Sequence, residues 1–176
     1  MLAQAKGSEG DARDALLKVA ERIRGVADAQ RKLAVASISL ERVLIGEHLQ
    51  GLCAGLERGM AGPGVRLETQ VTDLAVDASQ AACVSILVNE LVTNALKHAF
   101  PDSRGGTIRV TMAAAGREIE LQVADDGVGL EASTARRGTG LGTRLVETFV
   151  RQLRGRHEVT SDATGTRHRI LFPASR

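Results

Sequence analysis

The sequence predicts a two-layer α/β sandwich, in which a mixed β-sheet is covered by helices on one face. Two observations predict this fold. Residues 79–100 and 141–153 are apolar enough to form buried helices. Five shorter segments alternate polar and apolar residues with the period of two that is typical of half-buried strands. These candidate strands are residues 65–71, 107–113, 118–124, 157–161 and 166–172.

The composition suits a small soluble protein. Its 176 residues are enough for one domain, or for one domain with a short appendage. Hydrophobic residues make up 43% of the chain but aromatic residues only 2%, so the core must consist of Val, Leu, Ile and Ala. The 23 basic and 21 acidic residues nearly cancel, which argues against nucleic-acid binding. No run approaches the roughly 18 apolar residues that span a membrane, and no signal peptide is evident, so we expect a cytoplasmic chain.

Residues 1–10 resemble a frayed end, and residues 11–35 are expected to form the first helix, with Asp11 as its N-cap. Apolar residues recur there at steps of four and three, as in a coiled-coil seam, with Gln30 as a polar interruption. Because three heptads are few, an ordinary amphipathic helix fits equally well. The seam consists of Ala12, Leu16, Val19, Ile23, Val26 and Leu33.

The next helix is predicted over residues 45–60, before a Gly-Pro-Gly turn and the strand 65–71. His48 lies in this helix beside several leucines, and we expect it at the surface. Cys53 and Cys83 both lie in apolar helical segments. Two such cysteines are more often buried thiols than a disulfide or a metal site.

The rest of the chain depends on the helix predicted over residues 79–100, which ends before Pro101. Apolar residues make up most of its surface, but Glu90, Asn94, Lys97 and His98 follow one another at i, i+4, i+7 and i+8, on one face. A metal–phosphate group would satisfy all four side chains at once. The alternative interpretation is that this stripe simply faces solvent.

The second half of the sequence begins with a loop over residues 101–106 and a β-hairpin, whose strands 107–113 and 118–124 flank Gly116. The hairpin delivers Asp125 directly from a strand end. A short polar linker over residues 130–137 then leads to the helix 141–153.

Two closing strands follow that helix. Each contains one histidine, His157 and His168, which we interpret as structural or surface residues.

Two glycine-rich motifs follow the helix that carries this polar stripe: DDGVG at residues 125–129 and GTGLG at residues 138–142. The ordered set of NELVTNALKH, D-x-G-x-G and G-x-G-L-G resembles the GHKL, or Bergerat, ATP-binding fold of DNA gyrase, the ninety-kilodalton heat-shock chaperone, MutL and histidine kinases. The first motif, NELVTNALKHAFP, is similar to the HWE and related second-type (HisKA-2-like) histidine kinases. The resemblance covers the chain from about Asp11 to Pro173.

This resemblance implies an adenine site at the end of the hairpin. Asp125 would receive the adenine 6-amino group, and Thr166 would lie under the ring. Gly127 and Gly129 would allow the backbone to approach the flat base closely. Asp126 matches no required position and is interpreted as part of the turn.

The resemblance also implies a phosphate site at Gly138, Gly140, Leu141 and Gly142, where free backbone N–H groups precede a helix. The linker over residues 130–137 would be the lid over the nucleotide. Arg136 or Arg137 would either contact phosphate or remain in solvent.

Magnesium is the cofactor implied beside ATP, and Asn94 is the expected metal ligand because Mg²⁺ prefers oxygen atoms. Glu90 would orient a Mg²⁺-bound water or assist proton removal from the acceptor imidazole. Lys97 is a candidate phosphate contact, and His98 either joins it or is a helix-end residue.

The implied domain organisation is a partial dimerisation and phosphotransfer hairpin at residues 1–38, represented by its second helix, and an ATP-binding catalytic domain at residues 39–176. The chain would form a homodimer through the N-terminal helix. The first hairpin helix should carry a phosphoacceptor histidine, yet no histidine precedes His48. We therefore expect a fragment that begins at an internal Met; the alternative is a natural protein without the acceptor.

The leading functional hypothesis is the catalytic part of a sensor histidine kinase, which moves the ATP γ-phosphoryl group to a histidine for relay to a response-regulator aspartate. This chain would be the cytoplasmic portion of a larger sensor. Two alternatives are a degenerate regulatory binding module and a serine kinase of the anti-sigma type. A gyrase-like ATPase is least favoured, because no transducer domain follows Pro173.

Overall fold

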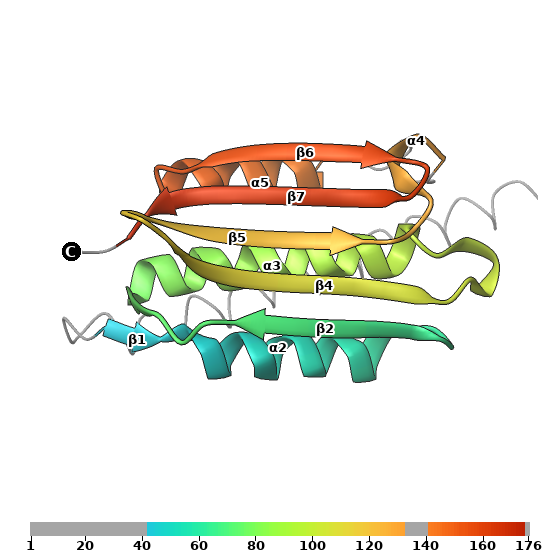
Figure 1. Cartoon of the computed structure of the whole chain (residues 1–176), viewed down its shortest axis with the longest axis horizontal. Coiled ribbons are helices and arrows are strands. Elements are labelled where there is room, and N and C mark those ends of the chain that lie inside the picture. The colour runs from blue at the N-terminus through green and yellow to red at the C-terminus, as the bar shows by residue number, and fades with distance from the viewer. Residues whose placement is uncertain (1–41, 133–140, 175–176) are drawn as a thin grey trace, which may run out of the picture.

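The computed structural model describes residues 42–132 and 141–174 (Figure 1). Its helices are α2 Ile45–Met60, α3 Ala78–His98, α4 Gly129–Ala132 and α5 Leu141–Gln152, with a 3₁₀ turn at Pro101–Ser103. Its strands are β1 Arg42–Leu44, β2 Val65–Val71, β3 Ala75–Asp77, β4 Gly106–Ala115, β5 Glu118–Asp125, β6 Arg156–Asp162 and β7 Gly165–Pro173. The helix expected at 11–35 and the boundary expected at 38 lie outside the described residues.

Five strands form one mixed sheet in the order β2-β4-β5-β7-β6. β2 and β4 are parallel and are joined through α3, whereas the other neighbours are antiparallel. Helices α2, α3 and α5 lie together on one side of this sheet (Figure 1). The predicted two-layer sandwich is therefore confirmed.

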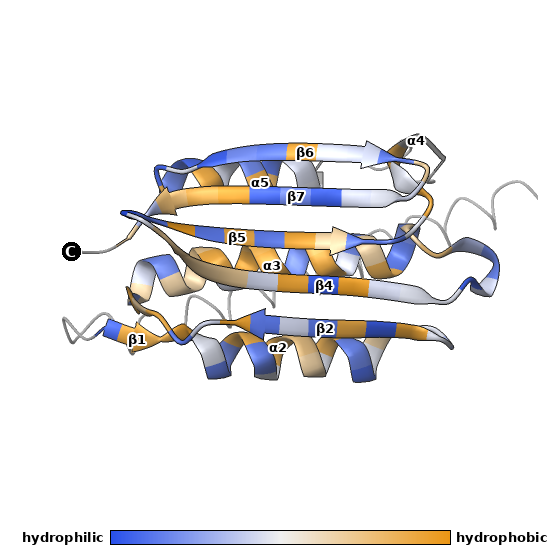
Figure 2. Ribbon diagram, viewed as in Figure 1, coloured by the Kyte–Doolittle hydropathy of each residue, from blue (hydrophilic) through white to orange (hydrophobic). Residues whose placement is uncertain are grey.

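The core lies between these helices and the inner face of the sheet. Strand residues alternate between buried and more exposed positions, and the same alternation of hydropathy is visible along β2 in Figure 2. α3 contributes the largest share of buried residues among the helices, and Asp77 caps it by accepting a hydrogen bond from the backbone N–H of Gln80 at 2.7 Å. Fully buried members of the core are Leu49, Leu87, Val88, Val92, Ile108, Val110, Leu121, Ile170 and Phe172.

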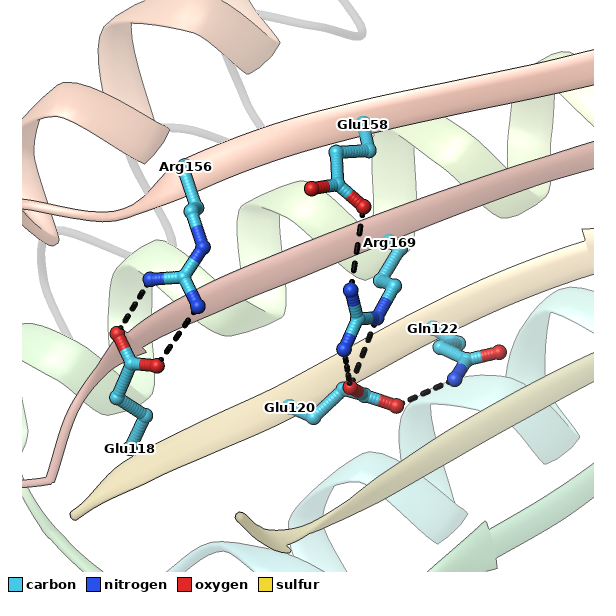
Figure 3. A network of polar contacts seen from close by, with 6 residues as sticks. All are labelled: Glu118, Glu120, Gln122, Arg156, Glu158 and Arg169. Atoms are coloured by element: carbon cyan, nitrogen blue, oxygen red, sulfur yellow. Dashed lines mark hydrogen bonds and ion pairs between the residues drawn. The ribbon is translucent and has the colours of Figure 1, made fainter. Parts of the chain in front are cut away.

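The outer face of the sheet is open to solvent and carries ion pairs (Figure 3). Arg156 on β6 reaches across β7 to Glu118 on β5, with its two nitrogens 2.6 and 2.8 Å from the carboxylate oxygens. Arg169 on β7 bonds Glu120 on one side and Glu158 on the other. Leu171 lies on the same face, between Glu120 and Arg156 in the strand register, and is only 3% exposed.

A pair of histidines lies on the inner face, near α5. His157 and His168 stack with ring centroids 5.2 Å apart, and Nε2 of the first lies 3.1 Å from Nδ1 of the second. Burial, with a smaller contribution from His157, lowers the pKa of His168 from 6.5 to about 4. The two histidines are therefore structural, which is one of the two roles that we interpreted from the sequence.

The expected roles of three other side chains are confirmed. His48 is exposed on α2, where its Nε2 lies 2.9 Å from the hydroxyl of Ser85. Cys53 and Cys83 are free thiols, 1% and 2% exposed. Within the described ranges, no helix combines the length and apolar character that crossing a bilayer requires.

Several element predictions were wrong in detail. The ribbon of β1 and β3 was not predicted, because three-residue strands are too short to show a period. α3 ends at His98 rather than residue 100, and the loop expected at 101–106 includes a 3₁₀ turn and the first residue of β4. The linker expected from residue 130 begins instead inside α4.

Candidate nucleotide-binding site

Asp125 is the last residue of β5, and its carboxylate is held by the backbone. Oδ1 accepts hydrogen bonds from the N–H of Gly127 at 3.0 Å and from the N–H of Thr166 at 3.3 Å. No described residue contributes a hydrogen bond to the second oxygen, Oδ2. Burial raises the pKa of Asp125, and the two N–H donors oppose that rise. One oxygen thus fixes the carboxylate, and the other can accept a bond from a ligand.

Thr166 lies beside Asp125 in the register of β5 and β7. It is 6% exposed, and its Oγ1 lies 3.0 Å from the hydroxyl of Ser161 on β6. The sequence-predicted pair Asp125 and Thr166 is therefore brought together. Ser161 completes a row of polar groups across three strands.

Gly127 packs the turn after β5 closely against the end of α3. A Cβ added at Gly127 would lie 2.4 Å from the carbonyl oxygen of Ala99, just after α3. The N–H of Val128 donates to that same carbonyl at 3.0 Å. The motif predicted that this glycine allows a flat ring to approach; the close approach that the structure shows is to the protein backbone.

Gly129 has a similar explanation. Its φ of 73° lies in the left-handed region, and an added Cβ would lie 2.0 Å from the carbonyl oxygen of Asp162 at the end of β6. The next residue, Leu130, donates its N–H to Ser161 Oγ at 2.9 Å. The D-x-G-x-G segment is thus packed against α3 at one glycine and against β6 at the other.

The contact between Ala99 and Val128 places the end of α3 next to Asp125. Along the polar stripe of α3, Glu90 is 6% exposed, Asn94 and His98 are partly buried, and Lys97 is exposed. The stripe therefore does not simply face solvent. Partial burial and the neighbouring Lys97 lower the pKa of His98.

The start of α5 is the third part of the site. α5 packs beside α3, and a short connection joins its C-terminus to the start of β6, so its N-terminus lies at the sheet end that carries Asp125 (Figure 1). Leu141 begins this helix and Gly142 is partly buried. Gly138, Gly140, Arg136 and Arg137 lie outside the described residues.

Two residues of this region, Asp126 and Ser161, were not predicted from the sequence to contribute to it. Asp126, interpreted only as a turn residue, accepts a hydrogen bond from Thr107 N–H at 2.7 Å, and its carbonyl accepts one from Arg104 at 3.0 Å. These bonds fix the start of β4 to the D-x-G-x-G turn. Ser161 was also missed, because its role depends on strand register rather than on a local motif.

The fold, the strand-end carboxylate and the adjoining polar stripe of α3 define an ATP-binding domain of the class found in histidine kinases and gyrases. Comparison with known families agrees. Residues 81–176 match the family of histidine kinase-, DNA gyrase B-, and HSP90-like ATPases. This match covers more than half of the chain, and the chain belongs to this family.

Sensor histidine kinases are among its relatives. The chain is 27% identical over 146 residues to blue-light-activated histidine kinase 2 of Erythrobacter litoralis, covering 81% of this chain and 42% of the relative. It is 36% identical over 159 residues to the histidine protein kinase DivJ of Caulobacter vibrioides, covering 81% of this chain and 23% of the relative. The chain thus spans less than half the length of these two relatives.

A solved structure supports the fold. The histidine kinase domain of the Erythrobacter litoralis EL346 blue-light-activated histidine kinase matches with a TM-score of 0.75. The match covers 88% of this chain and 74% of that chain at 24% identity.

Proposed function

We propose that this domain binds Mg·ATP and transfers its γ-phosphoryl group to a histidine on a phosphoacceptor helix, for relay to an aspartate of a response-regulator receiver domain. The observation that carries the proposal is Asp125, whose carboxylate is fixed through Oδ1 while Oδ2 is open to a ligand. Similarity to sensor histidine kinases supports the transfer step. The sequence of the motif NELVTNALKHAFP supports membership of the HWE or HisKA-2-like group of histidine kinases.

Adenine would be recognised at Asp125. The 6-amino group of adenine is a donor, and Oδ2 is an acceptor, so the two are complementary. Gly127 and Gly129 support this contact indirectly, because they hold the turn against α3 and β6. Thr166 lies beside Asp125 and would contact the same edge of the base.

The stripe on α3 fits a magnesium ion that is shared with phosphate. Asn94 offers an amide oxygen and Glu90 a carboxylate oxygen, which are the ligand types that Mg²⁺ prefers. In the described part of the chain, no cluster of three or more His, Cys, Asp or Glu could hold a metal, so phosphate and water would complete the coordination. Asn94 would hold the ion, and Glu90 would orient a bound water or accept the proton of the acceptor imidazole.

The phosphates would lie between the end of α3 and the start of α5. Lys97 and His98 would approach them from α3, and the backbone of Gly138, Gly140, Leu141 and Gly142 would approach from α5. In the transfer, the bond between the γ-phosphorus and the bridging oxygen breaks, a nitrogen–phosphorus bond forms, and ADP leaves.

The remaining parts of the proposal concern organisation. Residues 1–38 would be the second helix of a dimerisation hairpin, and residues 39–176 the catalytic domain. The chain would be a homodimer. A measured mass that equals one chain at every protein concentration would contradict this. A cytoplasmic location belongs to the proposal, because that compartment supplies ATP.

Calorimetric titration of Mg·ATP into the chain and into Asp125→Asn tests the nucleotide site. Asn retains an oxygen for Gly127 and Thr166 but presents an amide N–H₂ to the adenine amino group. We expect ATP affinity to fall by about 10- to 100-fold. Glu68→Gln is the matched control, because Glu68 pairs with Arg109 on the exposed part of the sheet. Equal ATP binding by all three proteins would contradict the adenine assignment.

Phosphotransfer is tested by supplying a complete dimerisation hairpin and labelled ATP. An acid-labile phosphoprotein is expected, since phosphohistidine hydrolyses in acid. An acid-stable phosphoserine on a partner would instead favour the anti-sigma type of kinase; one relative, 29% identical over 82 residues, is named an anti-sigma F factor. ATP binding without any phosphotransfer would favour a regulatory binding module.

A further inference from the structure

Ser161 lies outside the three motifs but bonds to two of the segments that form the adenine site. It is on β6, opposite Thr166 of β7. Its hydroxyl oxygen accepts the N–H of Leu130 at 2.9 Å, lies 3.0 Å from Thr166 Oγ1, and lies 3.2 Å from the carbonyl oxygen of Gly165. One side chain therefore connects β6, β7 and the chain leaving the D-x-G-x-G turn.

The proton count of this cluster permits two arrangements. A hydroxyl has one proton and two lone pairs, and Leu130 uses one lone pair of Ser161. If Ser161 donates to Gly165, Thr166 donates to Ser161 and presents only lone pairs to a ligand. If Ser161 donates to Thr166, the proton of Thr166 is free to bond an acceptor on a ligand.

The two arrangements suit different bases. Adenine presents a donor, its 6-amino group, beside an acceptor, N1. Hypoxanthine and guanine present the reverse, with an acceptor at position 6 and a donor at N1. Asp125 Oδ2 can only accept, so an adjacent Thr166 hydroxyl that donates would complement adenine alone.

We infer that Ser161 is a positioning residue for base selection: by donating to Thr166, it turns the Thr166 hydroxyl into a donor for the adenine ring, directly or through one water. This inference rests on the proposed ATP-binding function and adds a residue that sets the preference for adenine over hypoxanthine. The bond from Leu130 supports the role, because it holds Ser161 in place from the side of the D-x-G-x-G turn.

The contact with Gly129 makes the position of Ser161 well defined. The carbonyl of the next residue, Asp162, faces Gly129 at a distance that leaves no room for a side chain. Asp162 also accepts a hydrogen bond from Thr164 N–H at 2.8 Å, which fixes the β6–β7 turn. Ser161 is thus held between a tight turn and a tight backbone contact.

The test is calorimetry with ATP and inosine triphosphate on the full 176-residue chain and four variants: Ser161→Ala, Ser161→Thr, Thr166→Val, and the Ser161→Ala/Thr166→Val double variant. We expect Ser161→Ala to weaken ATP binding by about 3- to 10-fold and inosine triphosphate binding less, so that their ratio falls. Ser161→Thr keeps the hydroxyl and should restore the ratio. In the Thr166→Val background, Ser161→Ala should leave the ratio unchanged.

Thr160→Ala is the matched control, because Thr160 is an exposed hydroxyl on the same strand and points to the outer face. Thermal unfolding without nucleotide accompanies each titration. If Ser161→Ala weakens the binding of ATP and of inosine triphosphate equally, so that the ratio of their affinities stays as in the parent, the inference is overturned while the proposed ATP site stands. If the parent chain binds neither nucleotide, the proposed function fails and the inference fails with it.

Discussion

β5 carries carboxylates on both faces of the sheet, and their surroundings differ. On the outer face, hydrogen bonds from Arg156 lower the pKa of Glu118. Those from Gln122 and then Arg169 lower the pKa of Glu120. On the inner face, the described partners of Asp125 are two backbone N–H groups, and burial raises its pKa.

Burial also favours the neutral form of His168 on the inner face. Thr166 and His168 lie along the same side of β7, opposite Asp125 and Val123 of β5, and His157 stacks on His168 from β6. The outer face therefore satisfies its charges within the protein, whereas the inner end of β5 leaves an acceptor oxygen for a ligand. Charge pairing marks the solvent-facing surface of this sheet, whereas Asp125 has backbone partners and an open acceptor oxygen among the described residues.

The largest effect is expected from the histidine pair. The folded protein keeps His168 neutral down to about pH 4, whereas the unfolded chain takes up a proton near its ordinary pKa of 6.5. Stability should therefore fall as pH decreases through this window, by up to about 3 kcal/mol. Burial also lowers the pKa of the neighbouring His157, so His157 adds to the loss, and the charge of Glu147 partly opposes this shift.

Urea unfolding of the parent and His168→Phe at several pH values between about 7 and 4 measures this effect. The phenyl ring keeps the stacking but removes the titration, so the variant should lose less stability on acidification. His48→Gln is the control, because His48 is exposed. If the free energy of unfolding depended on pH equally in the parent and in His168→Phe, burial on the inner face would not keep His168 uncharged.

The next effect concerns the turn that follows β5. Gly127→Ala should destabilise the protein by about 1 to 3 kcal/mol, because the new methyl group would overlap the carbonyl of Ala99. Gly51→Ala is the matched control. Gly51 is exposed inside α2 with open space around it, so alanine there should stabilise by roughly 0.5 to 1 kcal/mol. Denaturant midpoints compare the two, and a Gly127→Ala variant as stable as the parent would refute the packing explanation.

Much of the fold was predictable because its elements are long and their patterns regular. α2 and β2 occupy the predicted residues, since the Gly-Pro-Gly turn separates a helical period from a strict alternation. The helix ending at His98 was predicted two residues too long, because apolar residues continue to Phe100. The β1–β3 ribbon offered no pattern, because each strand has only three residues.

The candidate site was predictable where a short motif, such as the glycines of D-x-G-x-G, indicates a particular backbone conformation. The D-x-G-x-G motif drew attention to Asp125, Gly127 and Gly129, but the packing of the two glycines was not predictable, because Ala99 and Asp162 are far from them in sequence. Ser161 could be found only from the register that places it opposite Thr166. Local sequence patterns thus locate the turn, and tertiary packing explains it.

A smaller effect is expected in the pH dependence of ATP binding. The ionised Asp125 carboxylate accepts a hydrogen bond from the adenine amino group at Oδ2, whereas a proton on Oδ2 would place a donor against that amino group. Burial raises the pKa of Asp125. ATP affinity should therefore weaken as pH falls through a range above the usual pKa of an aspartate, by up to about tenfold per pH unit. Calorimetry of the parent and Asp125→Asn isolates this contribution, because both bind the same triphosphate. Parallel pH profiles in the two proteins would exclude Asp125 as the titrating group.

The smallest effect is expected on the outer face. Arg156 and Glu118 are exposed, so a double-mutant cycle with Glu118→Gln and Arg156→Met should give a small coupling energy that decreases in high salt. Because the pKa of Glu118 is lowered, the coupling should be present near neutral pH and lost as pH falls through that lowered pKa.

The methionine in Arg156→Met keeps an apolar side chain beside Leu171 in the strand register. The variant therefore removes the charge of Arg156 while it retains most of the apolar packing. Neither substitution should change ATP affinity by more than about twofold, since Glu118 begins β5, Arg156 begins β6 at the same end of the sheet, and Asp125 lies at the other end. If the outer pair altered ATP binding as strongly as Asp125→Asn, the two faces of the sheet would not be independent, and the unpaired carboxylate would no longer distinguish the candidate site.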